Sequence, residues 1–335
     1  MIQPGPTPDE LRALAAAGGA APSLHNSQPW RFRPSADLRR LEVFADYRRA
    51  VPVTDPDGRA LHISVGAALL NLRVAAVQLG RDPVVRLTPG SAGRDPLAVV
   101  DLSARRPADA PPPFGRDLYP ALFRRHSSRE PFTNRDVPEA VLGELAAAAR
   151  AEGAAMAVLE EAGVRRVLDL TAEAEARIAA DVARQAETRS WLRPEAPAVD
   201  GIPASALGPQ DHDARVPMRS FTGRPPGPAT LPQPPTARFE ALPQLATLTT
   251  HGDRPADWLR AGQAMERVWL LATLYGLRLS VLHQAVEWPD TRPLLRDPEE
   301  GPGHVQLVLR CGYGPPGPAT PRRPVDDILD LPQGY

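Results

Sequence analysis

Two segments of this 335-residue chain match each other without gaps. The segment "VGAALLNLRVAAVQLG" (65–80) aligns with "AGQAMERVWLLATLYG" (261–276), and four aligned positions carry the same glycine or alanine. Each segment has the apolar pattern of a helix, and two strand-like runs follow each of them. Two copies of one unit normally pack across a pseudo-two-fold axis, as the subunits of a homodimer do. The sequence therefore predicts an α+β protein of two fused repeats that form an internal pseudo-dimer.

Periodicity and turn residues divide the chain into an N-terminal half, 1–110, and a C-terminal half, 111–335. A stretch rich in proline and alanine (103–117) is typical of a linker between them. Gly80 is the expected stop of the first long helix. Helices are expected at 9–21, 61–80, 137–153, 163–189 and 258–280, and strands at 30–34, 41–46, 83–89, 96–102, 154–160 and 304–314.

A long segment from Trp191 to Pro243 is crowded with proline and glycine. A structureless segment of that length is unusual inside a compact domain and is typically a functional lid or a disordered stretch. Proline favours a fixed cover, whereas Gly201, Gly208 and Gly223 would permit it to open.

The chain has no lysine, so all 39 basic residues are arginine. This excludes chemistry that needs a Schiff-base lysine or a P-loop lysine. Any anion held by a side-chain cation must be held by arginine or histidine, and arginine offers a bidentate fork suited to phosphate. The net charge of −1 gives no reason to expect a nucleic acid or a membrane as partner. No apolar run approaches a membrane span and no leader is evident, so we expect a cytoplasmic protein.

The motifs of several other protein classes are missing. The single cysteine, Cys311, excludes an internal disulfide, and we expect it to be buried in a strand. The seven histidines are scattered, and "DHD" (211–213) is expected to be a solvated loop, so no metal site is predicted. There is no G-x-S-x-G elbow of a hydrolase and no G-x-G-x-x-G after a strand.

Two arginine-rich stretches are candidates for anion binding. "RRHSSREPF" (124–132) brings three arginines and two serines into six residues, a mixture that suits a phosphate. The same residues would also suit a solvated basic turn in which a serine caps the following helix. "TPRRPV" (320–325) contains Arg322 and Arg323, which are either an exposed pair in the tail or part of the same site.

Several stretches resemble motifs of FMN-dependent nitroreductases. "PSLHNSQPWRF" (22–32) is similar to the P-S-x-x-N-x-Q-P-W motif of that family, and "RRHSSREPF" to its R-R/H-S-x-R/K-x-F motif. "YGLRLSVLHQ" (275–284) resembles the segment whose backbone lines the flavin edge, and "PRRP" (321–324) the C-terminal basic motif. "DGIPASALGP" (200–209) looks like an insert of the Acg-like branch, in which two nitroreductase units are fused. The resemblance implies a nitroreductase-like fold and FMN as cofactor.

The resemblance assigns cofactor contacts to residues of this chain. The loop is expected to line the flavin from across the internal interface with Pro22, Ser23, Leu24 and Asn26. The phosphate and ribityl end are expected to be held by Arg125, His126, Ser127 and Arg129 of the Arg–Ser motif, with Arg322 or Arg323 of the tail. Backbone amides of the segment Leu282, His283 and Gln284 are expected to face flavin N5 and O4. The family often has glutamate at the place of His283. No catalytic side chain is assigned, because flavin N5 carries the chemistry.

The sequences of the two halves predict that they divide one site between them. The first half has the P-S-x-x-N loop but no Arg–Ser motif, whereas the second has that motif but reads "RAEGAAMAVL" (150–159) where its loop should fall. One complete flavin site is therefore expected, in a monomer whose fused halves already bury the family's subunit interface. Trp30 is assigned to the core, and an extra residue before Phe132 leaves its register open.

The implied activity is ping-pong hydride transfer from NADPH or NADH, through flavin, to a nitroaromatic, a quinone or a related small molecule. The reverse sense, in which flavin oxidises a substrate, is equally allowed by such a site. If the proline-rich segment is a rigid lid over the flavin, the chain would instead bind or sequester FMN without turnover. A flavin-free remnant is the third alternative.

Overall fold

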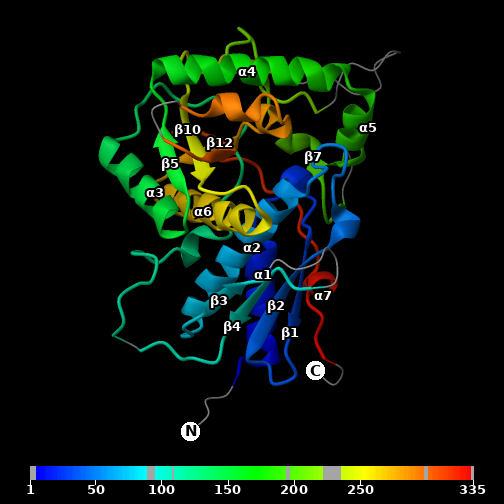
Figure 1. The fold of residues 1–335 in the computed structure, drawn as a ribbon, viewed down its shortest axis with the longest axis vertical. Helices are drawn as coiled ribbons and strands as arrows, with labels where there is room; N and C mark the ends of the chain where they lie inside the picture. Colours follow the sequence, from blue (N-terminus) through cyan, green and yellow to red (C-terminus); the bar gives the residue numbers. More distant parts are fainter. Residues whose placement is uncertain are drawn as a thin grey trace.

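The computed structural model describes residues 5–88, 95–107, 109–193, 197–221, 235–297 and 301–332. Two four-stranded sheets lie at opposite ends, and the long helices α2 and α6 lie between them (Figure 1). The elements of the first half are α1 (Pro8–Gly19), β1 (Trp30–Pro34), β2 (Arg40–Ala45), α2 (Arg59–Gln78), β3 (Val84–Leu87) and β4 (Ala98–Asp101). Those of the second half are α3 (Glu139–Ala151), β5 (Ala155–Val158), β10 (Gln244–Thr250), α6 (Pro255–Leu274), β11 (Arg278–Val281) and β12 (His304–Gly312).

The two halves have the same order of elements and the same sheet topology. The strand order is β1-β2-β4-β3 in the first sheet and β5-β10-β12-β11 in the second, and every pair is antiparallel. In each half a helix precedes the first strand, and the long helix separates the second strand from the last two. The predicted α+β class is confirmed, and a strand pair does follow each long helix.

The aligned glycines of the two long helices lie where these helices cross. A Cβ atom on Gly66 would lie 2.2 Å from the carbonyl oxygen of Leu259, and one on Gly262 would lie 2.0 Å from that of Ile63. Only glycine allows backbones to approach this closely. The other aligned pair, Gly80 and Gly276, follows the helix ends with φ of +70° and +75°, which favours glycine.

The structure corrects two expected helices and adds a strand. The helix expected at 258–280 ends at Leu274, because Gly276 reverses the chain and Arg278–Val281 pairs with β12. The helix expected at 163–189 is two helices, α4 (Glu161–Ala180) and α5 (Val182–Ser190). Asp181 separates them, and its carboxylate accepts hydrogen bonds from the backbone N–H groups of the first turn of α5. Strand β10 was not expected at all, because it directly follows the proline-rich segment.

One hydrophobic core runs through both halves. Trp30 is fully buried, and Cys311 is buried in β12, where burial raises the pKa of its thiol to about 12; both expectations are confirmed. Among the described helices, α2 alone is long and apolar enough to cross a membrane, but it is packed inside this core. Because the core crosses residue 110, the division into 1–110 and 111–335 stays a prediction.

The segment between β5 and β10 and the C-terminal tail both extend beyond the repeats. The former contains α4, which lies along the outer side of the second sheet, α5, and the short strands β6 (Leu192–Arg193), β7 (Ile202–Pro203), β8 (Gln210–Asp211) and β9 (Thr236–Ala237) (Figure 1). Residues 222–234, including Gly223, lie outside the described residues, so part of the expected lid does too. The tail runs beside β1 and contains α7 (Val325–Ile328), and Asp330 N–H donates to the carbonyl of Phe32.

Candidate functional site

Two adjoining cavities lie where the halves meet, and six residues line both of them, including Ser23, Ser127 and Arg129. The larger has an empty volume of about 910 Å³ and the smaller one of about 470 Å³. Of the thirteen residues expected at the cofactor, twelve line one cavity or both; Arg323 lines neither. The two stretches expected to share one site, from opposite halves of the chain, are therefore brought together.

The N-terminal wall of the site is a loop (20–29) with an unusual backbone. His25, Asn26 and Gln28 have φ of 51°, 54° and 52°, the left-handed region that costs energy for residues other than glycine. Hydrogen bonds hold this conformation: Asn26 Nδ2 donates to the carbonyls of Gly201 and Pro321, both at 2.9 Å, and Gln28 N–H donates to Ser23 Oγ at 2.9 Å. The loop is thus fixed by both the insert and the tail.

The two arginine-rich stretches converge behind this loop. Arg125 and Arg322 each donate to the carbonyl of Ala20, both at 3.1 Å, and Arg322 also donates to Asn26 Oδ1 at 3.0 Å. Burial, together with the charge of Arg125, lowers the pKa of the Arg322 guanidinium to about 9. The smaller cavity is therefore lined by two nearby guanidinium groups, together with His126.

A buried carboxylate beneath these arginines was missed by the sequence analysis. Glu266 of α6 is 0% exposed, and its Oε1 lies 3.2 Å from Nε of Arg125. Burial raises the pKa of Glu266 to about 7, although Arg125 opposes the shift. Glu266 falls on the face of α6 that an apolar pattern assigns to the core, so no local signal could mark it. Its carboxylate neutralises part of the positive charge of the arginines that the sequence analysis assigned to cofactor binding.

Arg129 lies at the junction of the two cavities. It donates to the carbonyl of Ala206 at 2.5 Å, and its guanidinium lies 4.9 Å from the ring centroid of Phe221. Burial and then the charge of Arg219 lower its pKa to about 10. The backbone of Gly208 crosses directly over it, since a Cβ on Gly208 would lie 2.5 Å from Cβ of Arg129. Gly208 and Gly201 both have positive φ and both lie where the backbone of the insert passes close to other atoms, so glycine is needed at each position.

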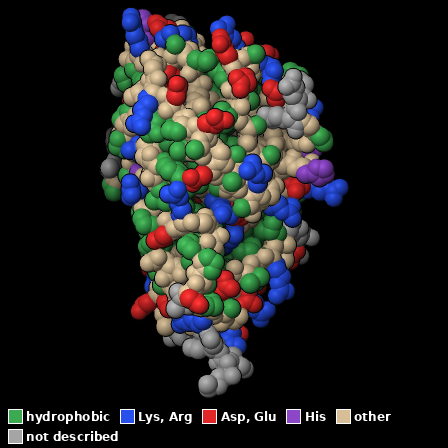
Figure 2. Space-filling model, turned by 90° about the vertical axis from the view of Figure 1, so that its left-hand side faces the viewer, with side chains coloured by type: hydrophobic (Ala, Val, Ile, Leu, Met, Phe, Trp, Pro, Cys, Tyr) green, Lys and Arg blue, Asp and Glu red, His purple; other side chains and the backbone are tan. Residues whose placement is uncertain are grey.

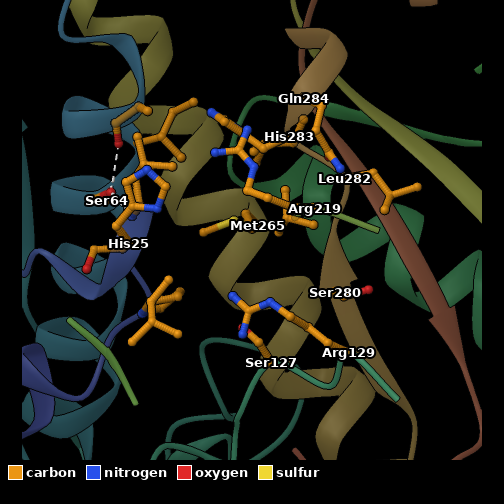
Figure 3. Close-up of a pocket in the computed structure, with 18 of the residues that line it drawn as sticks. His25, Ser64, Ser127, Arg129, Arg219, Met265, Ser280, Leu282, His283 and Gln284 are labelled. Carbon is orange, nitrogen blue, oxygen red and sulfur yellow. Dashed lines mark hydrogen bonds between the residues drawn. The ribbon is translucent and has the colours of Figure 1, made fainter. Parts of the chain in front are cut away.

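The larger cavity is mostly apolar, and the insert contributes three lining side chains that the sequence analysis did not single out: Met218, Arg219 and Phe221. Met265 of α6 and the Leu282–Gln284 segment line the same cavity, and Figure 3 shows them with Arg219. The described residues that line the two cavities include no carboxylate, in contrast with the outer face in Figure 2, where basic and acidic side chains are intermixed.

Two histidines line the larger cavity in the neutral form. Burial lowers the pKa of His25 well below its usual value, and Arg219 and Arg129 lower it further. Burial, Arg59 and Arg219 do the same for His283. His25 Nε2 is buried without a hydrogen-bond partner among the described residues. His25 belongs to the loop motif, but the motif did not assign it a role.

Arg323 and Phe132 are structural rather than cavity residues. Arg323 donates to the carbonyls of Gln28 and Trp30 at 3.1 and 3.3 Å. Its neighbour Arg322 faces the other way, as successive residues in an extended chain do. Phe132 packs under Arg310, with 3.8 Å between the guanidinium carbon and the ring centroid.

The reciprocal position of the second half is filled. There the loop between α3 and β5 is reduced to residues 152–154. Glu152 is buried and pairs with Arg73 of α2 at 2.5 Å and with Arg267 of α6 at 2.7 Å, and both arginines lie over the ring of Phe114. Phe114 also lines a separate cavity, together with residues of α2 and of the segment 106–118. No cluster of three or more potential metal ligands occurs in the described part of the chain.

Comparison with known proteins identifies the family. The chain is 32% identical over 339 aligned residues to "Putative NAD(P)H nitroreductase Rv3131" of Mycobacterium tuberculosis, covering 98% of this chain and 93% of that protein. It is 29% identical to "Putative NAD(P)H nitroreductase acg" of the same species, covering 97% and 96%. The chain belongs to the nitroreductase family. No protein-family model matches it.

Solved structures give weaker likenesses. A "putative nitroreductase" from Anabaena variabilis superimposes with a TM-score of 0.48 at 12% identity, over 91% of this chain and 88% of that one. A nitroreductase with bound FMN from Bacteroides fragilis does so with a TM-score of 0.36 at 13% identity, over 62% and 94%.

Proposed function

We propose that the protein is an FMN-dependent oxidoreductase that passes a hydride from NADPH or NADH to a small nitroaromatic, quinone or related acceptor. The observation that supports this best is the joining of a polar cavity to an apolar one at residues of two family motifs. The smaller cavity presents guanidinium, hydroxyl and imidazole groups suited to a phosphate. The larger presents side chains such as Met265 and Trp269, suited to a flat aromatic ring.

The residues present fit FMN. Arg322 Nε is buried without a hydrogen-bond partner among the described residues, and Arg322 lines the smaller cavity. His126, Ser127 and Arg322 would hold the phosphate, and Arg129 at the junction would place positive charge beside the ring. When bound, FMN supplies the atom that accepts and returns the hydride, N5. The protein's part is to orient the ring, exclude water and stabilise negative charge, and no side-chain acid or base is assigned.

A second candidate function is favoured by how firmly the insert is fixed. Gly201 exchanges hydrogen bonds with Asn26, and Asp200 pairs with both Arg49 and Arg193. An insert tied to the loop in this way, and crossing directly over Arg129, would support a cover that does not open. The protein would then bind FMN without turnover.

An anaerobic titration separates the two functions. The purified, FMN-loaded protein is titrated with NADPH and with NADH while the visible flavin absorbance is followed. Rapid bleaching that a quinone or a nitroaromatic reverses is the expected result for the oxidoreductase. Bound flavin that dithionite bleaches but neither nucleotide does would support the binding function. A protein that takes up no FMN would contradict both.

The assigned binding residues are tested with a pair of neighbouring arginines. Arg322→Gln should weaken FMN binding by about 10-fold or more, because a charge-assisted hydrogen bond to phosphate is lost. Arg323→Gln, which changes an arginine that also donates to backbone carbonyls but lies outside the cavities, is the matched control. Equal affinity in the two variants, measured by fluorescence titration, would contradict the assignment.

A further inference from the structure

The larger cavity has a second positively charged place, distinct from the one that suits a phosphate. Arg125, His126 and Arg322 line only the smaller cavity, whereas Arg219 and His283 line only the larger. FMN has a single phosphate, and Arg129 at the junction of the cavities already places positive charge beside its ring, so the place at Arg219 is left for a different anionic group. None of the described residues that line the larger cavity has a carboxylate.

Arg219 is held in place by a carboxylate that it shares. Its Nη2 is hydrogen-bonded to Glu287, and Glu287 also accepts from Arg184 at 3.2 Å. The side chain of Glu287 is only 2% exposed and that of Arg219 only 9%. Arg184 also pairs with Asp181 at 3.6 Å, and Glu287 does not line the cavity, so Arg219 is the charged member of this cluster that faces the cavity. Arg219 is thus a fixed cation at the cavity wall rather than a free surface arginine.

The neighbours of Arg219 add hydrogen-bonding capacity without negative charge. Figure 3 shows Arg219 between His25 and His283, and its charge contributes to keeping both rings neutral. His25 Nε2 is buried without a partner in the described part of the chain. Behind His283, Arg59 donates to the carbonyls of Gln306 at 2.6 Å and Val286 at 3.4 Å. A neutral imidazole can donate one hydrogen bond to an anionic oxygen that Arg219 binds.

The surroundings restrict what the ligand can be. Ile63, Met265, Leu282 and Leu307 also line this cavity, so the anionic group must be attached to an apolar body. The two phosphates of a nicotinamide dinucleotide are hydrophilic and bulky, and burying them among these side chains would be costly. A small aromatic ring with one ionised carboxylate, sulfonate or phenolate meets both requirements.

We propose that Arg219, assisted by His25, binds an anionic substituent of the electron acceptor, so that the natural acceptors are small aromatic or quinonoid acids. This inference rests on the proposed oxidoreductase function. It makes the insert a specificity-determining element, because Arg219 comes from the segment "RVPMRSF" (215–221).

The test compares two acceptors of nearly the same shape, 4-nitrobenzoate, which is anionic, and 4-nitrobenzamide, which is neutral. The FMN-loaded wild-type protein should prefer the acid by about 10- to 100-fold in kcat/KM, the effect expected for one charge-assisted hydrogen-bond pair. Arg219→Gln should lower the acid-to-amide ratio of kcat/KM to about one. Glu287 keeps Arg184 as its partner in this variant. Arg215→Gln, in the same segment but exposed, is the control and should retain the preference.

Two outcomes overturn the inference. In the first, the wild type shows no preference for the acid, or Arg219→Gln retains it. In the second, Arg219→Gln changes FMN affinity or the rate of flavin reduction by NAD(P)H but leaves the acid-to-amide ratio unchanged, which places Arg219 at the cofactor. If the single variant folds poorly, the double variant Arg219→Gln/Glu287→Gln repeats the comparison, and Arg184 then keeps Asp181 as its partner.

A binding measurement keeps this inference separate from the proposed function. Trp269 lines the cavity, so quenching of its fluorescence reports ligand entry whether or not turnover occurs. A protein that takes up no FMN, or whose flavin NAD(P)H does not reduce, contradicts the proposed function. If it still binds 4-nitrobenzoate more tightly than the amide, and Arg219→Gln loses the difference, the anion subsite is supported on its own.

Discussion

Replacing Glu266 by glutamine should remove a large part of the pH dependence of stability. Glu266 is fully buried, and its pKa in the folded protein is about 7, against an ordinary value of 4.5. Because the folded value is the higher one, protonation of Glu266 favours folding. Its contribution is therefore fully present below about pH 4.5 and is lost as the pH rises to about 7.

The size of the effect follows from the difference between the two pKa values. At about 1.4 kcal/mol for each tenfold change in proton affinity, the rise from 4.5 to about 7 corresponds to roughly 3 kcal/mol. Between pH 5 and pH 8 the wild type should lose roughly 2 to 3 kcal/mol through this group. Glu266→Gln is neutral in both the folded and the unfolded protein and should lack this loss.

The assay is urea unfolding of wild type and Glu266→Gln at several pH values from 5 to 8. The difference between their free energies of unfolding isolates Glu266, because His25 and His283 titrate equally in both proteins. Glu144→Gln, at an exposed glutamate of α3, is the control and should show no such trend. The reasoning is refuted if the difference between wild type and Glu266→Gln stays constant across this range.

Two further substitutions test buried contacts, one where the long helices of the two halves cross and one at an ion pair within the second half. Gly262→Ala should lower the free energy of unfolding by about 1 to 3 kcal/mol, because its Cβ would meet the backbone of Ile63 at the helix crossing. Gly143→Ala in α3, where a Cβ meets open space, should stabilise slightly, and urea unfolding that ranks the two variants otherwise would contradict this. Arg310→Ala should cost about 3 to 5 kcal/mol, because it leaves Glu240 buried without its partner. Thermal unfolding should show a smaller loss when Glu240→Ala is added.

Much of the candidate site could be predicted because its signals are short and local. The loop that contains Asn26 and the stretch that contains Ser127 each have their own pattern of letters, and the structure brings both to the same cavities. The helix end at Gly276 was also readable, since Gly276 aligns with Gly80. The apolar run continued past it to Ser280, however, and a run of that kind does not distinguish a helix from a buried strand.

The sequence by itself determined that there are two similar α+β units, that an anion must be bound by arginine or histidine, and that the halves contribute different motifs. Periodicity, composition and short motifs are local properties, so they can be read from the sequence without knowledge of the fold. The tertiary structure alone decided that Arg322 rather than Arg323 faces the cavity, that Glu266 lies beneath Arg125, and that Arg219 joins His25 and His283. Each of these contacts depends on the direction of a side chain and on which distant segment of the chain packs against it. No local sequence pattern encodes that direction.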